Sequence, residues 1–470
     1  MNIQQLYTNC LAQGAYYISH NGEAAIIDPL RETQPYLDLL KKNNDRLKYI
    51  FETHFHADFV SGHVDLAKAT GATIVFGPQA QTQYKSYFAK DNEEFKIGGL
   101  TLKALHTPGH TLESTTFLLI DENNKSLCIF TGDTLFIGDV GRPDLAIKSD
   151  LTQEDLAGML YDSLRTKIMA LPDDLIVYPA HGAGSACGKN MSKETSDTLG
   201  NQKKTNYALQ DISKEAFVKE LTTGILPAPQ YFAKNASLNK NGYKNFNEVL
   251  KKGLIGLNAE EFEKLMKEKQ PIVLDVRKAE DFAKAHIPSS LFIGLEGQFA
   301  PWVGTLINNI DVALLLVAPE GKEEEAVMRL SRVGYDNCLG YLAGGMKAWI
   351  EAGKTNGEVK TVSAEIFIDM LSTRLDVIDV RKPGEYDSGH VKNVDSNPLD
   401  FIYDWVKTKD VNKPYLIHCA GGYRSMIALS ILKLNGFKDL TNVNGGFGAI
   451  SQLKKAKENL VSEEIKSLNI

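Results

Sequence analysis

The stretch Thr53-His54-Phe55-His56-Ala57-Asp58-Phe59 sets two imidazoles and a carboxylate at alternate positions. It follows residues 47–51, a β-branched and aromatic run that is typical of a strand. Further ligand-type residues follow hydrophobic runs at Pro or Gly turn signals: His110 in Pro-Gly-His-Thr, Asp133 in Thr-Gly-Asp-Thr and His181 in Pro-Ala-His-Gly. Because such turn signals mark strand ends, the pattern predicts a metal site at the rim of a β-sheet.

The order of these motifs resembles the metallo-β-lactamase superfamily. The resemblance implies an α/β fold, an αβ/βα sandwich with metal ligands on the loops at one edge. Relatives with two metals usually carry a histidine after the aspartate of the first motif, and here Phe59 has no lone pair to donate. We therefore expect one metal. Two histidines, one carboxylate and open positions suit non-haem Fe(II) that activates dioxygen, whereas hydrolytic zinc prefers three protein ligands or two bridged metals.

A closer resemblance is to the persulfide dioxygenases. It rests on three stretches, 10–13, 52–58 and 138–144. It implies one Fe(II) per chain, held by His54, His110 and Asp133. His56, Asp58 and His181 are then groups that orient ligands and bound water, or the remnant of a second metal site. Direct ligation by His56 or His181 stays open.

Arg142 and Cys187 are candidate substrate-binding residues. Arg142 can pair with a carboxylate of the thiol carrier through two hydrogen bonds, or form a structural ion pair with Asp139 or Asp144. Cys187 lies shortly after the last histidine motif in a glycine-rich loop. It can relay sulfur at the mouth of the metal site, or be a small buried hydrophobe.

Composition limits the function classes. The net charge of −7 offers no basic surface for nucleic acid. No apolar run reaches a membrane-spanning length, and the start shows no basic segment followed by an apolar one. Five scattered cysteines fit reduced thiols of the cytoplasm better than a disulfide framework. A homo-oligomer stays open.

The C-terminal half repeats itself. Residues 272–277 recur at 377–381, and Gly344-Gly345 recurs as Gly445-Gly446. A period of about 100 residues indicates a domain duplication, and strand runs alternating with helical patterns predict a doubly wound parallel sheet in each copy. We expect three domains: 1–255, in which residues 211–255 extend the metal domain and lead into a linker, then 256–356 and 357–470.

The second copy carries a reactive cysteine. Residues 415–418 form an apolar strand, Cys419-Ala420-Gly421-Gly422-Tyr423-Arg424-Ser425 follows, and a helix is expected over 426–434. A cysteine before a helix N-terminus is surrounded by backbone N–H groups that favour a thiolate, and Arg424 adds a positive charge. The copy resembles a rhodanese domain, which implies that Cys419 carries a persulfide with Arg424 beside it.

The first copy has lost these groups. Ala318 falls opposite Cys419, and Glu323 falls opposite Arg424. Alanine cannot form a persulfide, and a glutamate repels anions. We interpret residues 256–356 as an inactive rhodanese-like module.

The resemblances together predict a persulfide dioxygenase fused to a sulfurtransferase. A low-molecular-weight thiol persulfide, such as glutathione persulfide, would be oxidised with O2 to sulfite and thiol, and Cys419 would exchange sulfur with sulfite or thiosulfate. One alternative is a glyoxalase II-like thioester hydrolase of the hydroxyacylglutathione hydrolase type, with two metals, fused to a sulfurtransferase. The other is a non-catalytic sulfur carrier or sensor.

Overall fold

The computed structural model describes residues 1–146, 151–225, 227–371 and 376–462. The chain divides into two compact units. The N-terminal unit holds Met1–Glu248 and Met328–Asp336, and the C-terminal unit holds Val249–Val327 and Asn337–Ile470. The predicted borders at 255 and 356 stay predictions. Among the described residues, no helix has both the length and the apolar character that crossing a bilayer requires.

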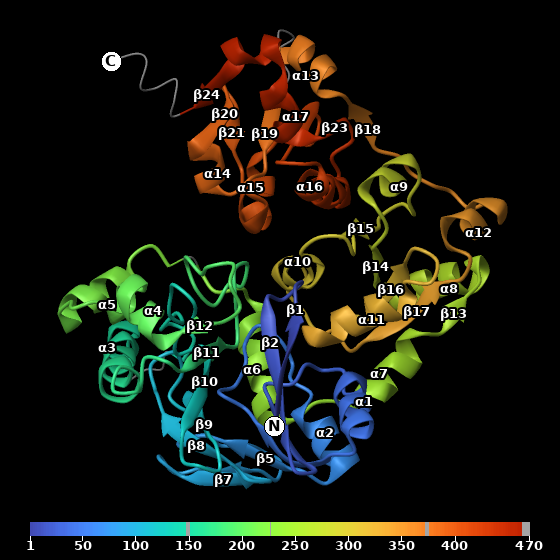
Figure 1. Ribbon diagram of the computed structural model, residues 1–470. Helices are drawn as coiled ribbons and strands as arrows, with labels where there is room; N and C mark the ends of the chain where they lie inside the picture. The colour runs from blue at the N-terminus through green and yellow to red at the C-terminus, as the bar shows by residue number, and fades with distance from the viewer. Residues whose placement is uncertain (147–150, 226, 372–375, 463–470) are drawn as a thin grey trace, which may run out of the picture. The chain divides into compact units, whose positions relative to one another are not determined.

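Two six-stranded sheets form the centre of the N-terminal unit (Figure 1). The first sheet follows the chain order: β1 (Asn2–Thr8), β2 (Gln13–His20), β3 (Glu23–Ile27), β4 (Arg46–Phe51), β5 (Thr73–Phe76) and β6 (Tyr87–Phe88). The second sheet runs in reverse chain order from β12: β12 (Asp197–Thr198), β11 (Ile176–Pro179), β10 (Ser126–Gly132), β9 (Thr115–Ile120), β8 (Leu100–His106) and β7 (Glu94–Ile97). Strands β3 to β6 are parallel, as are β10 and β11.

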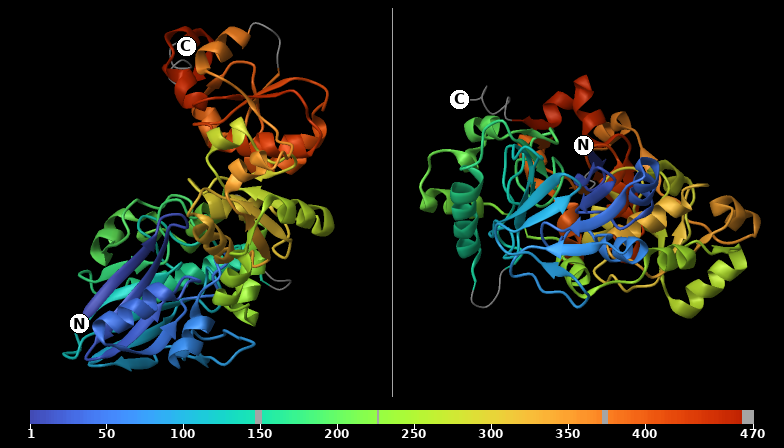
Figure 2. Two further views of the ribbon diagram at one scale, coloured as in Figure 1. Left: turned by 90° about the vertical axis from the view of Figure 1, so that its right-hand side faces the viewer. Right: turned by 60° about the horizontal axis from the view of Figure 1, so that its bottom comes forward.

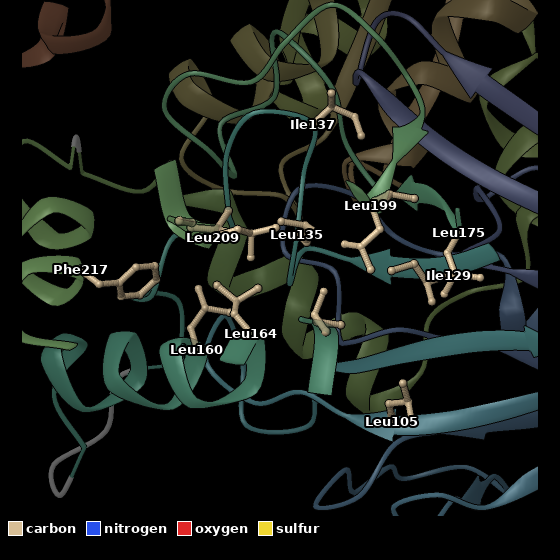
Figure 3. Packing of buried hydrophobic residues seen from close by; sticks show 14 of the residues in the cluster. Leu105, Ile129, Leu135, Ile137, Leu160, Leu164, Leu175, Leu199, Leu209 and Phe217 are labelled. Atoms are coloured by element: carbon tan, nitrogen blue, oxygen red, sulfur yellow. The ribbon is translucent and has the colours of Figure 1, made fainter. Parts of the chain in front are cut away.

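Helices cover the outer face of each sheet. The helices of this unit are α1 (Gln34–Asn43), α2 (His63–Thr70), α3 (Gln153–Ser163), η1 (Leu164–Ile168), α4 (Leu199–Thr205), η2 (Tyr207–Leu209), α5 (Lys214–Thr222) and α6 (Tyr231–Asn241). Alternating strand residues such as Phe51 and Phe117 fill the space between the sheets. Apolar side chains of α1 and α2 pack against the outer face of the first sheet. Apolar side chains of α3, α4 and α5 pack against the outer face of the second sheet. Figure 3 shows Leu160 and Leu164 pointing toward Leu135 and Leu209 in the second of these clusters. The αβ/βα sandwich is therefore present.

The described part of 211–255, a stretch that we expect to lead into a linker, is largely helical. It contains α5, α6 and α7 (Phe246–Gly253). Helix α6 buries Tyr231 and Phe232, but it also buries Asn235 and Asn239, which a hydrophobic pattern cannot reveal. The border between the two units falls inside α7, after Glu248, so α5 and α6 belong to the N-terminal unit.

The C-terminal unit contains the duplication. The first copy has the parallel sheet β13 (Gly256–Leu257), β17 (Cys338–Leu342), β16 (Leu314–Val317), β14 (Ile272–Asp275), β15 (Leu291–Phe292). The second has β18 (Lys360–Val362), β23 (Leu440–Val443), β22 (Tyr415–His418), β19 (Asp376–Asp379), β21 (Asp395–Ser396), also parallel. Both sheets have the same order of equivalent strands. The left view of Figure 2 shows the second sheet between helices. The predicted doubly wound sheets are confirmed.

The helices of the two copies also correspond. In the first copy they are α8 (Ala259–Lys269), α9 (Ala279–Lys284), α10 (Phe299–Leu306), α11 (Glu323–Arg332) and α12 (Gly345–Glu351). In the second they are α13 (Ala364–Met370), α14 (Pro383–Ser388), η4 (Leu399–Phe401), α15 (Ile402–Trp405), η5 (Val406–Thr408), α16 (Tyr423–Leu434), α17 (Gly446–Gln452) and η6 (Lys454–Asn459). A small sheet pairs β20 (Gly389–Val391) with β24 (Leu460–Ser462).

Candidate metal centre and cysteine loop

Three predicted ligands meet at one edge of the N-terminal sandwich. His54 follows β4, His110 follows β8 and Asp133 follows β10 directly, and all three side chains are buried. The Nε2 atoms of His110 and His54 lie 3.3 Å and 3.8 Å from Asp133 Oδ2. One potential ligand atom from each residue lies within 4.8 Å of the others. One ion can therefore contact all three side chains after small shifts.

Hydrogen bonds fix the tautomer of His54. The Thr53 hydroxyl donates its only proton to Asp28 Oδ2 at 2.8 Å, because a carboxylate only accepts. Thr53 Oγ1 lies 2.9 Å from His54 Nδ1 and must accept there. His54 therefore carries its proton on Nδ1 and leaves the Nε2 lone pair for a metal.

His110 is held in the same tautomer by a different partner. Its Nδ1 donates to the backbone oxygen of Arg142 at 2.8 Å, so Nε2 carries the lone pair. Asp133 Oδ2, which both Nε2 atoms face, is buried without a hydrogen-bond partner among the described residues. A buried carboxylate oxygen without a donor is costly unless a cation satisfies it. The three side chains thus fit a metal ion.

The protonation states also fit a ligand set. Burial, and then the charge of His56, hold the pKa of His54 well below its ordinary value. Burial alone would raise the pKa of Asp133, but the neighbouring His181, His54 and His110 lower it. Around neutral pH the cluster therefore presents a neutral imidazole at His54 and an anionic carboxylate at Asp133, the forms that bind metals.

His181 lies between two carboxylates. Its Nδ1 lies 2.8 Å from Asp133 Oδ1 and its Nε2 lies 2.8 Å from Asp58 Oδ2. Burial lowers the pKa of His181, but the two aspartates raise it well above the ordinary value. Cys187 is buried in the same cluster, and its potential ligand atom lies within 4.8 Å of those of Asp58 and His181. This group is where a second metal could bind. Burial, then Asp58 and Asp133, raise the pKa of the Cys187 thiol well above its ordinary value.

His56 belongs to a third group. Its Nε2 lies 3.1 Å from Asp28 Oδ1 and 3.5 Å from Glu52 Oε2. The Phe59 ring packs on the His56 ring with centroids 4.3 Å apart. Asp28 thus lies close to His56 Nε2 and also accepts from Thr53, which in turn accepts from His54.

The metal loop, residues 54–61, is held by groups that the sequence did not reveal. Asn239 Nδ2 donates to the backbone oxygens of His56 and Phe59 at 2.7 Å and 2.8 Å, and Asn239 Oδ1 accepts from Ser61 N at 2.9 Å. The Val60 N–H donates to the Arg332 oxygen at 2.7 Å. Asp28 could have been found, because Ile26-Ile27-Asp28-Pro29 is another strand end with a turn signal.

Arg142 has a partner within its own loop. Its Nε and Nη2 donate to the two carboxylate oxygens of Asp144 at 2.6 Å and 2.7 Å. Its Nη1 donates to the backbone oxygen of Ala186 at 3.2 Å. The structural ion pair that the sequence left open is thus formed, and carboxylate binding by Arg142 would require this pair to open.

The cysteine loop lies where the sequence placed it, between β22 and α16. The Gly422 N–H donates to Cys419 Sγ at 3.1 Å, and Ser425 Oγ lies 3.6 Å from the same sulfur. Helix α16 begins at Tyr423, earlier than the expected 426. Gly446 lets α17 approach, because a Cβ there would lie 2.3 Å from the Cys419 oxygen.

Arg424 pairs with Glu385 from the same copy. Its Nη1 and Nη2 donate to Glu385 Oε2 and Oε1 at 2.5 Å and 2.7 Å. In the first copy, Ala318 follows β16 as Cys419 follows β22, and α11 begins with Glu323. The two loops therefore occupy equivalent places with different chemistry.

The αβ/βα sandwich with His54, His110 and Asp133 at one edge defines a metal-binding class of enzyme. The C-terminal unit adds a duplicated doubly wound module. The family model described as the metallo-β-lactamase superfamily matches residues 9–181, and the rhodanese-like domain model matches residues 258–352 and 363–453. Human mitochondrial persulfide dioxygenase ETHE1 is 34% identical over 210 residues, 44% of this chain and 74% of that protein. The chain belongs to the metallo-β-lactamase superfamily, as an ETHE1-like member with tandem rhodanese-like domains.

Two further similar proteins are relevant to the function. A probable hydroxyacylglutathione hydrolase of Schizosaccharomyces pombe is 34% identical over 161 residues, 33% of this chain and 58% of that protein. A crystal structure of a metallo-β-lactamase from Staphylococcus aureus subsp. aureus COL matches with a TM-score of 0.66 and 30% identity. That match covers 72% of this chain and 98% of that chain, so it extends beyond the metallo-β-lactamase region.

Proposed function

We propose that this enzyme is a persulfide dioxygenase that also transfers sulfur through Cys419. One observation supports the first activity: the Nε2 lone pairs of His54 and His110 both face Asp133 Oδ2, which has no hydrogen-bond partner among the described residues. This arrangement offers one ion two nitrogens and one carboxylate oxygen, which is the donor set that suits ferrous iron. The ETHE1 relative supports the choice of chemistry.

The chain's own residues would orient the ligands. Thr53 and the Arg142 carbonyl hold the two imidazoles by their Nδ1 protons. His181 holds Asp133 Oδ1, so Oδ2 stays directed at the two Nε2 atoms. We therefore assign His181, Asp58 and His56 to orienting roles and not to ligation.

The metal site would bind the thiol persulfide and dioxygen next to each other. Bound Fe(II) would supply open positions for a sulfur ligand and dioxygen. A thiol persulfide R–S–SH, O2 and water would then give R–SH and sulfite. Holding both reactants in one buried site supplies the proximity on which such a reaction depends.

Cys419 would carry the sulfur of the second activity. The Gly422 N–H already points at Sγ and stabilises negative charge there. Thiosulfate would be formed when the outer sulfur of a Cys419 persulfide passes to sulfite. All five cysteines are free thiols, which fits the reducing cytoplasm that we propose as the compartment.

A glyoxalase II-like thioester hydrolase is the second candidate. It is favoured by the Asp58, His181 and Cys187 group, which could hold a second ion, and by the hydroxyacylglutathione hydrolase relative. Against it, Phe59 adds no ligand, and both nitrogens of His181 face carboxylates. We therefore place it second.

One experiment separates the candidates. The protein is purified without oxygen, its metal content is measured, and oxygen uptake is followed with glutathione persulfide and then with S-lactoylglutathione. We expect one iron per chain, uptake with the persulfide and no thioester cleavage. Two zinc ions per chain with thioester hydrolysis would contradict the dioxygenase assignment.

A further inference from the structure

Ser425 lies between the sulfur of Cys419 and a polar side chain of the neighbouring strand β23. Its hydroxyl oxygen is 3.6 Å from Cys419 Sγ, 2.8 Å from Asn442 Oδ1 and 3.1 Å from the Gly422 carbonyl oxygen. The side chains of Cys419, Ser425 and Asn442 are all buried. Hydrogen bonds between buried groups are stronger than in water, so the chain Asn442–Ser425–Cys419 can influence the charge on the sulfur.

The Ser425 hydroxyl has a single proton and two lone pairs. In the structure this proton faces Asn442 Oδ1 or the Gly422 carbonyl oxygen, and both of these atoms can only accept. A lone pair of Ser425 is then left toward the sulfur, where it accepts the S–H proton of Cys419. The arrangement in the structure is therefore the one that suits the neutral thiol.

A thiolate at Cys419 reverses this requirement, because an anionic sulfur can only accept. The Ser425 proton must then face the sulfur, since a lone pair there would repel the charge. Asn442 can follow the change. A half-turn of its amide puts the Nδ2 donor where Oδ1 was, and the Ser425 oxygen accepts from it. An asparagine can thus support both charge states of the cysteine, whereas an aspartate or a leucine cannot.

The copy without the cysteine has lost this chain of hydrogen-bonding groups. The strand registers show which positions are equivalent: Ile417 is paired with Asn442 in the second copy, and Leu316 is paired with Tyr341 in the first. At the three positions the first copy has other residues: Ala318 for Cys419, Glu324 for Ser425 and Tyr341 for Asn442. The serine and the asparagine therefore occur only in the copy that has the cysteine.

We propose that Asn442 is a positioning residue for sulfur transfer, whose amide turns the Ser425 hydroxyl toward Cys419 when the sulfur becomes anionic. The inference rests on the proposed sulfur-carrier role of Cys419. When sulfite attacks the outer sulfur of the Cys419 persulfide, a new S–S bond forms, the old S–S bond breaks, and its electron pair stays on Cys419 Sγ. The Ser425 proton stays on its oxygen and donates a hydrogen bond to the leaving sulfur, and a better stabilised thiolate leaves faster. No oxidant or reductant is consumed.

The first test measures how readily Cys419 ionises. The full chain is alkylated with iodoacetamide over a range of pH, and the rate at Cys419 is followed by peptide mass spectrometry. Asn442→Leu takes the amide donor from the thiolate form, while the thiol form keeps the Gly422 oxygen as an acceptor. Asn442→Asp offers only an acceptor and holds the Ser425 proton away from the sulfur. We expect the pH of half-maximal rate to rise by about half a unit in Asn442→Leu and by about one unit or more in Asn442→Asp.

The same two substitutions are then made in a Ser425→Ala background. A carboxylate near the sulfur raises the half-maximal pH by its charge alone, and this part of the shift persists without Ser425. We expect Asn442→Leu to cause no shift there, and Asn442→Asp to cause a shift smaller by about one unit. Asn444→Asp, which adds a charge to the wall of the same cavity, is the matched control and should cause equal shifts in both backgrounds.

Equal shifts for the Asn442 variants with and without Ser425 would overturn the proposal, because Asn442 would then act through charge or packing alone. Asn442→Leu keeps the comparison decisive if the buried carboxylate of Asn442→Asp prevents folding.

The second test measures the transfer itself. Cys419 is loaded with sulfur from thiosulfate, and a single turnover with sulfite is followed by intact-protein mass spectrometry. We expect Asn442→Leu to slow the release at saturating sulfite about threefold and to leave the half-saturating concentration unchanged, because the leaving sulfur is affected and sulfite binding is not. A change confined to the half-saturating concentration would contradict the positioning role. If the wild type cannot be loaded while the alkylation shifts are as expected, the sulfur-carrier role fails and the effect of Asn442 on Cys419 ionisation stands.

Discussion

The metal centre and the cysteine loop are assembled in opposite ways. The cysteine loop is one contiguous turn, in which Gly422 and Ser425 contact the sulfur from three and six positions along the chain. The metal centre gathers side chains that follow three different strands, and its supports come from residues as distant as Asn239 and Arg332. A local site can therefore be disabled by one change, whereas a distributed site can be weakened by degrees from many places.

The largest effect is expected at the local site. Cys419→Ser should lower thiosulfate:thiol sulfurtransferase activity by at least about 10³-fold, since no covalent carrier remains. Oxygen uptake with glutathione persulfide and metal content should not change, because the metal ligands lie in the other unit. Ala318→Cys made in the Cys419→Ser background is the matched control. We expect it to restore nothing, because Glu323 and Glu324 follow it; sulfur transfer by Cys419→Ser alone would show that the loop is not the carrier.

A graded effect is expected at the distributed site. Thr53→Val keeps the shape of the side chain but removes the oxygen between Asp28 and His54. Loss of such a ligand-orienting partner should weaken iron binding about 10–100-fold, as measured by competition with a chelator. Thr441→Val, at a buried threonine of β23, is the control and should bind iron normally. Unchanged affinity in Thr53→Val would remove the argument that Thr53 fixes the tautomer of His54.

The same contrast explains what the sequence could predict. The place of the Cys419 loop between a strand and a helix could be predicted because strand, turn and helix are consecutive, whereas the helix start at Tyr423 and the pairing of Arg424 with Glu385 could not. The three candidate ligands could also be predicted, because each follows a hydrophobic run at a turn signal. Their convergence then follows from the fold. Cys187 is different: the sequence left open whether it relays sulfur or is a small buried hydrophobe, and the structure buries its side chain beside His181.

The supports of the metal loop could not be predicted in this way. Asn239 lies in a polar stretch whose buried face contains asparagines, so hydrophobic periodicity fails there. The Arg332 carbonyl is a backbone group, and no residue type marks its role. Its side chain pairs with Glu32, and Arg31 pairs with Asp336 at 2.9 Å, which anchors Met328–Asp336 in the N-terminal unit.

The pH dependence of the C-terminal unit should be visible independently of the metal centre. His286 Nδ1 donates to the Phe282 oxygen at 2.9 Å, and Nε2 lies 3.3 Å from Lys433 Nζ, so the neutral ring is required. Burial, assisted by the Lys433 charge, lowers the pKa of His286 from 6.5 to about 4. Because the unfolded chain binds this proton more tightly, stability is complete above pH 6.5 and falls as the pH decreases to 4.

The free energy of unfolding should fall by at most about 3 kcal/mol between pH 6.5 and pH 4, and His286→Gln should remove this pH dependence. All three tryptophans, Trp302, Trp349 and Trp405, lie in the C-terminal unit. Urea unfolding followed by tryptophan fluorescence at several pH values therefore reports this unit alone. An equal acid dependence in the wild type and in His286→Gln would assign the effect to other groups.

A further effect is expected from the remote support of the metal loop. Asn239→Ala removes the three hydrogen bonds to His56, Phe59 and Ser61 and leaves their buried backbone groups unpaired. We expect local opening of residues 54–61 to become easier by about 2 kcal/mol, measured as faster hydrogen exchange of that segment. Asn241→Ala is the matched control on the same helix, since Asn241 is exposed. If the segment exchanged equally fast in both variants, the metal loop would be held by its own turns, and the contrast between a local and a distributed site would lose its strongest support.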